Sequence, residues 1–262
     1  MRRRTSLSSS ASDWWARRPL VIAHRGAARL APENTLAAFR LAADLGADAV
    51  ELDARLTADG EVVVLHDKLL DRTTNGSGPV SQRTRHELQA LDAGARFSPD
   101  FAGERIPTLD QVFEAVGSRL LINVELKNYD SAFDRLVAQV SSRVRAHGLQ
   151  RRVLLSCFSP ISLWTAHLIA PEIPRALLLY AGQPRWMRAV FPRITYCQAH
   201  HPQDPVTDLR LLESLRRGGR RVNVWTVNSE GRMRELLAFG CDGLITDVPD
   251  TARRAVQDAA KG

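Results

Sequence analysis

Polar residues of the kinds used in phosphoester chemistry follow short apolar segments near the start of the chain. His24, Arg25 and Gly26 come directly after one such segment, and Glu51 and Asp53 lie two residues apart in the next. A histidine exchanges protons near neutral pH, an arginine binds phosphate oxygens through two hydrogen bonds, and paired carboxylates bind hard divalent cations. These residue types together predict a metal-assisted reaction on a phosphate ester.

A third carboxylate, a lysine and a second histidine extend this set. Glu125 and Lys127 end another apolar segment and lie two residues apart, so their side chains share one face of a strand. His66 follows a further apolar segment and can act with His24 as general acid and base. Three carboxylates without Cys/His clusters at zinc spacing favour one divalent cation, Ca²⁺ or Mg²⁺. Lys127 either adds a charge beside the phosphate or forms a simple ion pair with Glu125.

The elements that position these residues alternate between two patterns. Amphipathic stretches that end at glycine, at residues 35–45, 130–147, 208–217 and 229–239, predict helices. Short segments rich in bulky apolar residues predict buried parallel strands. There are eight of these, at residues 20–23, 49–53, 120–125, 152–157, 176–180, 194–197, 222–226 and 243–246. This alternation predicts a TIM (β/α)8 barrel, in which catalytic groups lie at the C-terminal ends of the strands.

One part of the chain is too long for a single strand–helix unit. Residues 54–119 contain a further predicted strand at 61–65, which we place outside the barrel in an insertion over about residues 56–107. A helix over about residues 109–116 leads back to the barrel. The rest of the chain, residues 19–262, is predicted to be one domain. Residues 1–18 are predicted to be a disordered basic tail, whose Trp14 and Trp15 either pack on the bottom of the barrel or bind a partner.

Composition limits the class of protein. The 262 residues carry a net charge of +7, and most of that charge lies in the arginines of the tail. A mildly basic body suits an anionic small-molecule substrate and lacks the clustered cations of a nucleic-acid-binding protein. The three cysteines form no CxxC pair and are predicted to be buried and reduced, which favours a cytoplasmic protein. We expect no signal peptide and no membrane span.

Several longer motifs resemble one known family. The segments AHRGAARLAPENTLAAF, VELDARLTADGEVVVLHDKLLDRTTNG, IPTLDQVFEAV, INVELK, VNVWTVN and DGLITDVP occur in this order between Leu20 and Pro249. They resemble the glycerophosphodiester phosphodiesterase family. The resemblance implies a TIM barrel with a small insertion after the second strand. It also implies metal-dependent hydrolysis of glycerophosphodiesters to sn-glycerol 3-phosphate and an alcohol.

The resemblance also implies roles for individual residues. The family's metal ligands correspond to Glu51, Asp53 and Glu125, and its acid–base pair corresponds to His24 and His66. The family mechanism begins with attack on phosphorus by the glycerol hydroxyl beside the phosphate. A cyclic phosphate forms, and water then opens it.

Residues that contact substrate are implied in the same way. The family's phosphate contacts correspond to Arg25 and Lys127, and its substrate-facing aromatic residue corresponds to Trp225. Taken alone, a tryptophan in an apolar segment is more typical of a core. Glu33 and Asn34 correspond to residues that support the site from behind. The preferred alcohol, the preferred ion and the oligomeric state do not follow from the motifs.

Two other functions are compatible with parts of the sequence. A related barrel phospholipase, of the phosphatidylinositol-specific or sphingomyelinase D type, would need an apolar lid, for which the insertion offers only Leu69, Leu70 and Phe97. A non-catalytic protein could bind anions through the arginines of the tail. Asp247 is expected to bind the N–H groups of the next helix, and Asp67 and Arg72 to hold the insertion. His200 and His201 are placed at the barrel mouth without a role.

Overall fold

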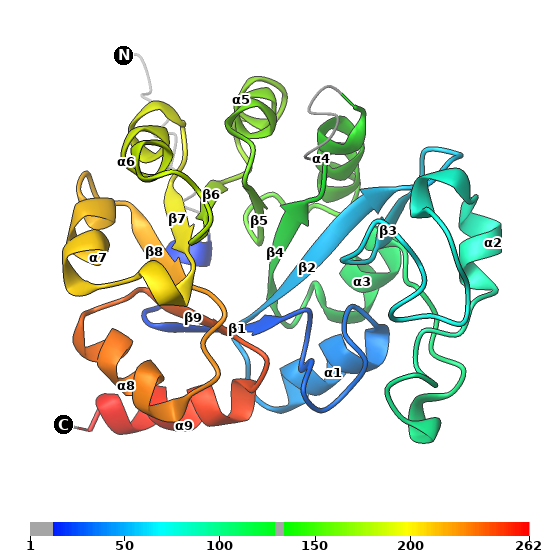
Figure 1. Cartoon of the computed structure of the whole chain (residues 1–262), viewed down its shortest axis with the longest axis horizontal. Coiled ribbons are helices and arrows are strands. Elements are labelled where there is room, and N and C mark those ends of the chain that lie inside the picture. The colour runs from blue at the N-terminus through cyan, green and yellow to red at the C-terminus, as the bar shows by residue number, and fades with distance from the viewer. Residues whose placement is uncertain (1–12, 129–133, 262) are drawn as a thin grey trace, which may run out of the picture.

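The computed structural model describes residues 13–128 and 134–261. Within these residues, nine strands form one sheet, and eight of them run parallel and close on themselves, because β1 pairs with both β2 and β9 (Figure 1). This arrangement confirms the predicted TIM barrel. The barrel strands are β1 (Leu20–His24), β2 (Ala49–Leu56), β4 (Leu121–Leu126), β5 (Val153–Cys157), β6 (Arg175–Leu179), β7 (Ala199–Pro202), β8 (Arg221–Val224) and β9 (Gly243–Thr246).

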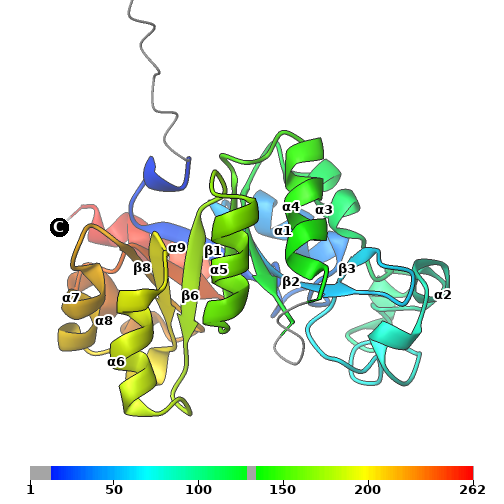
Figure 2. The ribbon, with the colours of Figure 1, turned by 90° about the horizontal axis from the view of Figure 1, so that it is seen from above.

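Helices surround the barrel and bury its outer face (Figures 1 and 2). Apolar side chains of helices and strands form one large core between the two layers. The helices are α1 (Leu36–Asp44), α3 (Leu109–Val116), α4 (Leu136–Ala146), α5 (Pro160–Ile169), α6 (Arg185–Ile194), α7 (Leu209–Arg216), α8 (Glu230–Ala238) and α9 (Pro249–Ala259). The helix predicted at 130–147 begins outside the described residues, which resume at 134. No helix in the described ranges has the length and apolar character needed to cross a bilayer.

The segment between β2 and α3 forms a small unit beside the barrel. Its strand β3 (Val62–Val64), predicted at residues 61–65, runs antiparallel to the C-terminal part of β2. Its short helix α2 (Arg85–Gln89) begins at a capping box made by Thr84 and Glu87. A separate apolar cluster, which includes Leu70 and Leu88, holds the unit together. The loop after β3 is thereby fixed next to the C-terminal ends of the barrel strands.

One predicted strand is wrong. Residues 194–197 were expected to form the sixth barrel strand, but Ile194 ends α6 and the strand is β7, at Ala199–Pro202. The apolar pattern failed because two of the four residues of β7 are buried histidines. His200 bonds the carbonyl oxygen of Leu215 in α7 through Nδ1, at 3.2 Å. His201 lies buried against Asn223 of β8 and not at the barrel mouth, where both histidines had been placed.

The N-terminal end of the barrel is closed by a residue assigned to the tail. Asp13–Trp15 forms a short 3₁₀ turn, and Trp14 is only 2% exposed. Its ring packs against apolar side chains inside the barrel, and its indole N–H donates to the carbonyl oxygen of Arg152 at 2.9 Å. The tail predicted at 1–18 is therefore too long, because residues 13–18 belong to the folded body. Residues 1–12 lie outside the described ranges.

Candidate active site at the barrel mouth

Seven of the eight predicted site residues line one cavity of about 150 Å³ at the C-terminal ends of the strands. The eighth, Asp53, lies directly beside it. His24 ends β1, Glu51 and Asp53 lie on β2, and Glu125 lies on β4. These strands are neighbours, and Asp53 pairs in register with Glu125. The strand pairing therefore brings together side chains that are far apart in the sequence.

The three carboxylates form a buried cluster. Glu51, Asp53 and Glu125 each place a carboxylate oxygen within 4.8 Å of the other two. Burial and the charges of Asp53 and Glu125 raise the pKa of Glu51 well above its ordinary value. Burial also raises the pKa of Glu125, against the opposing charge of Lys127. The carboxylates therefore repel one another, and their hard oxygen donors suit a divalent cation.

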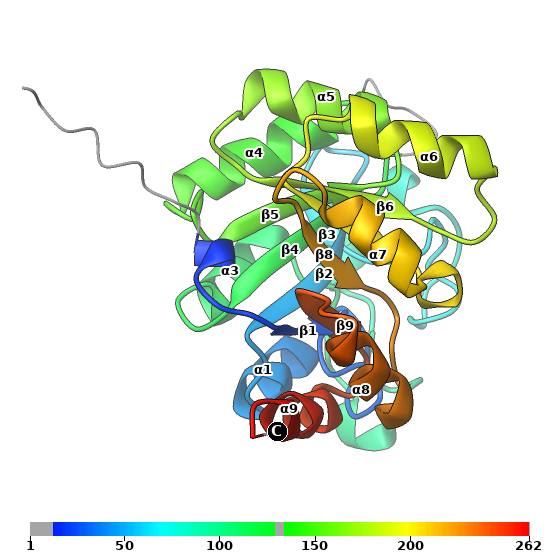
Figure 3. The same ribbon diagram turned by 90° about the vertical axis from the view of Figure 1, so that its left-hand side faces the viewer.

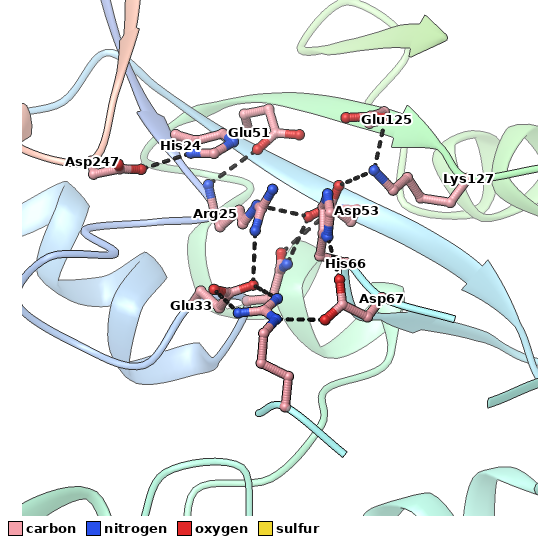
Figure 4. A network of polar contacts seen from close by, with 12 residues as sticks. His24, Arg25, Glu33, Glu51, Asp53, His66, Asp67, Glu125, Lys127 and Asp247 are labelled. Atoms are coloured by element: carbon pink, nitrogen blue, oxygen red, sulfur yellow. Dashed lines mark hydrogen bonds and ion pairs between the residues drawn. The ribbon is translucent and has the colours of Figure 1, made fainter. Parts of the chain in front are cut away.

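Two cations flank the cluster (Figure 4). Lys127 Nζ lies 3.2 Å from Asp53 Oδ1 and 3.0 Å from Glu125 Oε1. Arg25 Nε lies 3.3 Å from Asp53 Oδ2, and the Arg25 main-chain N–H donates to Glu51 at 3.1 Å. Burial alone would raise the pKa of Asp53, but Lys127 and Arg25 hold it well below its ordinary value. The ion pair between Glu125 and Lys127, one of the two alternatives given for Lys127, is present as one part of this network.

The balance of charge in the cavity agrees with a phosphodiester ligand. The three carboxylates and two cations leave one negative charge when all are ionised. A bound divalent cation would change that to one positive charge, which a phosphodiester, a monoanion, neutralises.

The conformation of the loop after β1 positions Arg25 beside the cavity. Arg25 and Asn34 both have positive φ, 54° and 59°. A Cβ on Gly26 would lie 2.7 Å from Ala38, so only glycine fits between the loop and α1. The Asn34 side-chain amide donates to Asp53 Oδ2 at 2.8 Å, and its main-chain N–H donates to the Arg25 carbonyl. Asn34 thereby supports both Arg25 and Asp53, as the resemblance implied.

Each candidate histidine is paired with an aspartate through Nδ1. His24 Nδ1 lies 2.7 Å from Asp247 Oδ1, and Asp247 also accepts from the amide of Asn228 at 2.6 Å. Burial would raise the pKa of Asp247, but His24 and Asn228 hold it below its ordinary value. A carboxylate on Nδ1 fixes the ring and leaves Nε2 for proton exchange. Asp247 was expected to bind helix N–H groups, and that expectation is wrong.

The second pair comes from the insertion. His66 Nδ1 lies 2.6 Å from Asp67 Oδ1, and Asp67 is in turn bonded by Arg72. Two N–H groups of Arg72 donate to the carboxylate of Glu33, each at 2.7 Å. Burial lowers the pKa of His66, which favours the neutral ring. Figure 4 shows the resulting chain of contacts, which continues from Glu33 to Arg25.

An aromatic wall forms the remaining side of the cavity. Trp225 follows β8, and its indole N–H donates to the carbonyl oxygen of His201 at 2.7 Å. Phe158, after β5, meets Trp225 edge to face at a centroid distance of 5.7 Å. Trp225 therefore lines the cavity, as its predicted role requires. Phe158 also lines the cavity, but it was not among the predicted site residues. The sequence signal that could have found Phe158 is its place directly after a barrel strand.

Comparison with known proteins agrees with this geometry. The model of the glycerophosphoryl diester phosphodiesterase family matches residues 24–251. A glycerophosphodiester phosphodiesterase of Caldanaerobacter subterraneus is 39% identical, over 88% of this chain and 95% of the relative. One of Bacillus subtilis is 33% identical, over 89% of this chain and 85% of the relative.

Solved structures give the same result. An Oleispira antarctica phosphodiesterase in complex with the product sn-glycerol-3-phosphate has a TM-score of 0.85 and 31% identity, and the match covers 93% of this chain and 99% of that one. A glycerophosphodiester phosphodiesterase from Agrobacterium tumefaciens has a TM-score of 0.78 and 33% identity, covering 90% and 99%. Sequence, fold and site together show that the chain belongs to the glycerophosphoryl diester phosphodiesterase family.

Proposed function

We propose that this protein hydrolyses glycerophosphodiesters to sn-glycerol 3-phosphate and an alcohol, with two histidines and one divalent cation, Ca²⁺ or Mg²⁺. The observation that carries the proposal is the convergence of three buried carboxylates, two cations and two histidine–aspartate pairs on one cavity. The Oleispira phosphodiesterase with bound product supports the choice of substrate.

Glu51, Asp53 and Glu125 would hold the cation. When bound, such an ion neutralises negative charge on the phosphate and makes the phosphorus more electrophilic. Arg25 and Lys127 lie on the cavity wall beside these carboxylates and bind the remaining phosphate oxygens. Trp225 packs against the glycerol carbons.

The two histidines move protons in two steps. One histidine removes the proton from the glycerol hydroxyl beside the phosphate as its oxygen attacks phosphorus. The other protonates the oxygen of the departing alcohol as its bond to phosphorus breaks. In the second step, water opens the cyclic phosphate and the histidines exchange roles. Asp247 and Asp67 orient His24 and His66 through Nδ1 and stabilise the charged ring while it holds the proton.

The test is release of sn-glycerol 3-phosphate from glycerophosphocholine by the purified protein. Activity should disappear with EDTA and return with Ca²⁺ or Mg²⁺, and a panel of diesters would establish the preferred alcohol. His24→Ala should lower activity by about 10²–10⁴-fold and leave the unfolding midpoint unchanged. Absence of turnover of every glycerophosphodiester with either ion would refute the proposal.

The metal site can be tested apart from turnover. Glu51→Gln keeps the volume of the side chain but removes one carboxylate of the cluster, so calorimetry should show at least about tenfold weaker cation binding. Asp59→Asn, at an exposed turn, is the matched control and should bind the cation as the wild type does. Equal affinity of wild type and Glu51→Gln would place the ion elsewhere.

We also propose that the protein acts in the cytoplasm. Its three cysteines are buried and unpaired, which agrees with a reducing compartment. Cell fractionation with an antibody against the protein would test this, and recovery from an oxidising compartment would contradict it.

A further inference from the structure

The outer surface of α6 carries a line of exposed apolar side chains. Trp186 is 60% exposed, Val190 39% and Ile194 52%. These residues are four apart, so they lie one above the other along the helix. Met187 and Phe191 turn to one side of this line, and Arg185, Arg188 and Arg193 turn to the other. An exposed tryptophan in such a line is unusual for a surface in contact with water alone.

The neighbouring helix α5 presents a matching line. Ile161 is 49% exposed, Trp164 52% and Leu168 75%. The indole N–H of Trp164 donates to the carbonyl oxygen of Ile194 at 3.4 Å, which joins the two lines. Figures 2 and 3 show α5 and α6 side by side on the outside of the barrel. We call the surface formed by Ile161, Trp164, Leu168, Trp186, Val190 and Ile194 the α5–α6 apolar face.

Positive charge borders this face. A groove of about 580 Å³ between α6 and α7 is lined by five arginines and one carboxylate, Asp208. The arginines are Arg185, Arg188, Arg193, Arg217 and Arg220. Arg193 and Arg220 donate to main-chain carbonyl groups, and none of the five forms an ion pair with a carboxylate among the described residues. The groove therefore keeps a strong net positive charge.

The face also leads to the catalytic cavity. An apolar pocket of about 630 Å³ lies between the start of α5 and α6, and its lining includes Tyr180, Met187 and Phe191. Phe158 and Trp225 line both this pocket and the catalytic cavity. A hydrocarbon environment in contact with the α5–α6 apolar face would thus lie next to the barrel mouth.

We propose that the α5–α6 apolar face docks on the surface of a bilayer that contains anionic phospholipid. Tryptophan and aliphatic side chains enter the boundary between head groups and acyl chains, while arginines attract the anionic head groups. A second copy of the chain is a poorer occupant, because it would bring two arginine grooves together. Docking goes beyond the proposed hydrolysis and does not require it. Together with that hydrolysis, it would give the enzyme access to diesters at a membrane.

Vesicle flotation tests docking without measuring activity. The full chain is mixed with phosphatidylcholine vesicles that contain about 30 mol% phosphatidylglycerol, or none, and the bound fraction is measured. Binding should require the anionic lipid and should weaken when ionic strength rises from about 0.05 M to about 0.5 M. Absence of binding at low salt, or equal binding to both vesicles, would overturn the proposal.

Substitutions then locate the surface. Trp186→Ser, and separately Leu168→Ser, should weaken binding about fivefold or more, because each removes an apolar side chain from the interface. The matched control is Phe97→Ser. Phe97 is 45% exposed on the insertion, which lies on the other side of the molecule from α6. A control that lost as much binding as Trp186→Ser would refute docking through this face.

Charge is tested in parallel. Arg185→Gln with Arg217→Gln should weaken binding by about fivefold for each arginine removed. Arg40→Gln with Arg96→Gln removes two exposed arginines from other surfaces and should change binding little.

Sedimentation of the free protein distinguishes self-association from membrane docking. A dimer that Leu168→Ser dissociates would show that a second copy of the chain covers the α5–α6 apolar face. Turnover of soluble glycerophosphocholine without vesicles should be unchanged in all of these variants.

Discussion

Replacement of Asp247 with asparagine tests whether the aspartate beside His24 acts in the reaction. The carboxylate accepts a 2.7 Å hydrogen bond from His24 Nδ1, and the side chain is 21% exposed. Asparagine keeps the shape but not the charge. A hydrogen bond to a charged partner is worth about 1.5–3 kcal/mol, against about 0.5–1.5 kcal/mol for a neutral one. The charged hydrogen bond is thus worth about 1–2 kcal/mol more than the neutral one when the His24 ring is protonated. Its loss raises the activation free energy by that amount and lowers kcat by about five- to thirtyfold.

The assay is steady-state hydrolysis of glycerophosphocholine with saturating cation. KM should change little, because Asp247 does not line the cavity proposed to bind the substrate. Urea unfolding should show a stability close to that of the wild type. Asp250→Asn is the matched control, since Asp250 is paired with Arg254 and does not contact His24. Its kcat should equal that of the wild type.

A double-mutant cycle decides whether Asp247 acts through His24. If it does, Asp247→Asn should have no further effect once His24 has been replaced by alanine. Two results would refute the reasoning: a kcat within threefold of the wild type, or a double variant whose losses are additive.

Three further predictions concern buried groups. Lys127→Met should lower the free energy of unfolding by about 3–5 kcal/mol, because it removes a cation that contacts both buried carboxylates Asp53 and Glu125. A loss below about 1 kcal/mol in urea would contradict this. Burial raises the pKa of Cys157 and Cys241 to about 12 and that of Cys197 to about 11, so Ellman's reagent should label them at pH 8 only in urea. Burial lowers the pKa of His201 to about 3, below its unfolded value of about 6.5. The stability from its neutral ring is therefore complete above that unfolded value and is lost as pH falls toward 3. His201→Asn should make the acid loss of stability shallower by about 1 kcal/mol per pH unit, as measured by urea unfolding from pH 7 to 4.5; an unchanged slope would contradict it.

The barrel could be predicted from the sequence because most of its strands are short apolar segments separated by amphipathic ones. The apolar pattern does not identify β7, because this strand carries His200 and His201 and the apolar residue Ile194 belongs to a helix. In a sequence pattern, histidine counts as a polar residue. A neutral histidine ring can nevertheless be buried in a core when it forms hydrogen bonds. For Trp14, the alternative of packing on the bottom of the barrel is confirmed. Only the end of the tail, predicted at residue 18, is wrong, because the arginines near Trp14 resemble a solvated tail.

The candidate site could be predicted only where its residues share a strand or a motif. Glu51 and Asp53 are two residues apart, and His24 and Arg25 are adjacent. The partner of His24 lies 223 residues away, and only the closed sheet brings Asp247 beside it. The link from Arg72 to Glu33 likewise joins two loops 39 residues apart. Such contacts depend on tertiary structure, and no local spacing encodes them.

The position of Trp14 bears on the order of events during turnover. Because its ring closes the N-terminal end of the barrel, reactants and products exchange through the mouth. In the proposed reaction, the alcohol must leave by this entrance before the hydrolytic water arrives, and sn-glycerol 3-phosphate leaves last. Added sn-glycerol 3-phosphate would therefore compete with the substrate for the empty enzyme, whereas added alcohol would instead drive the cyclic phosphate back toward the diester.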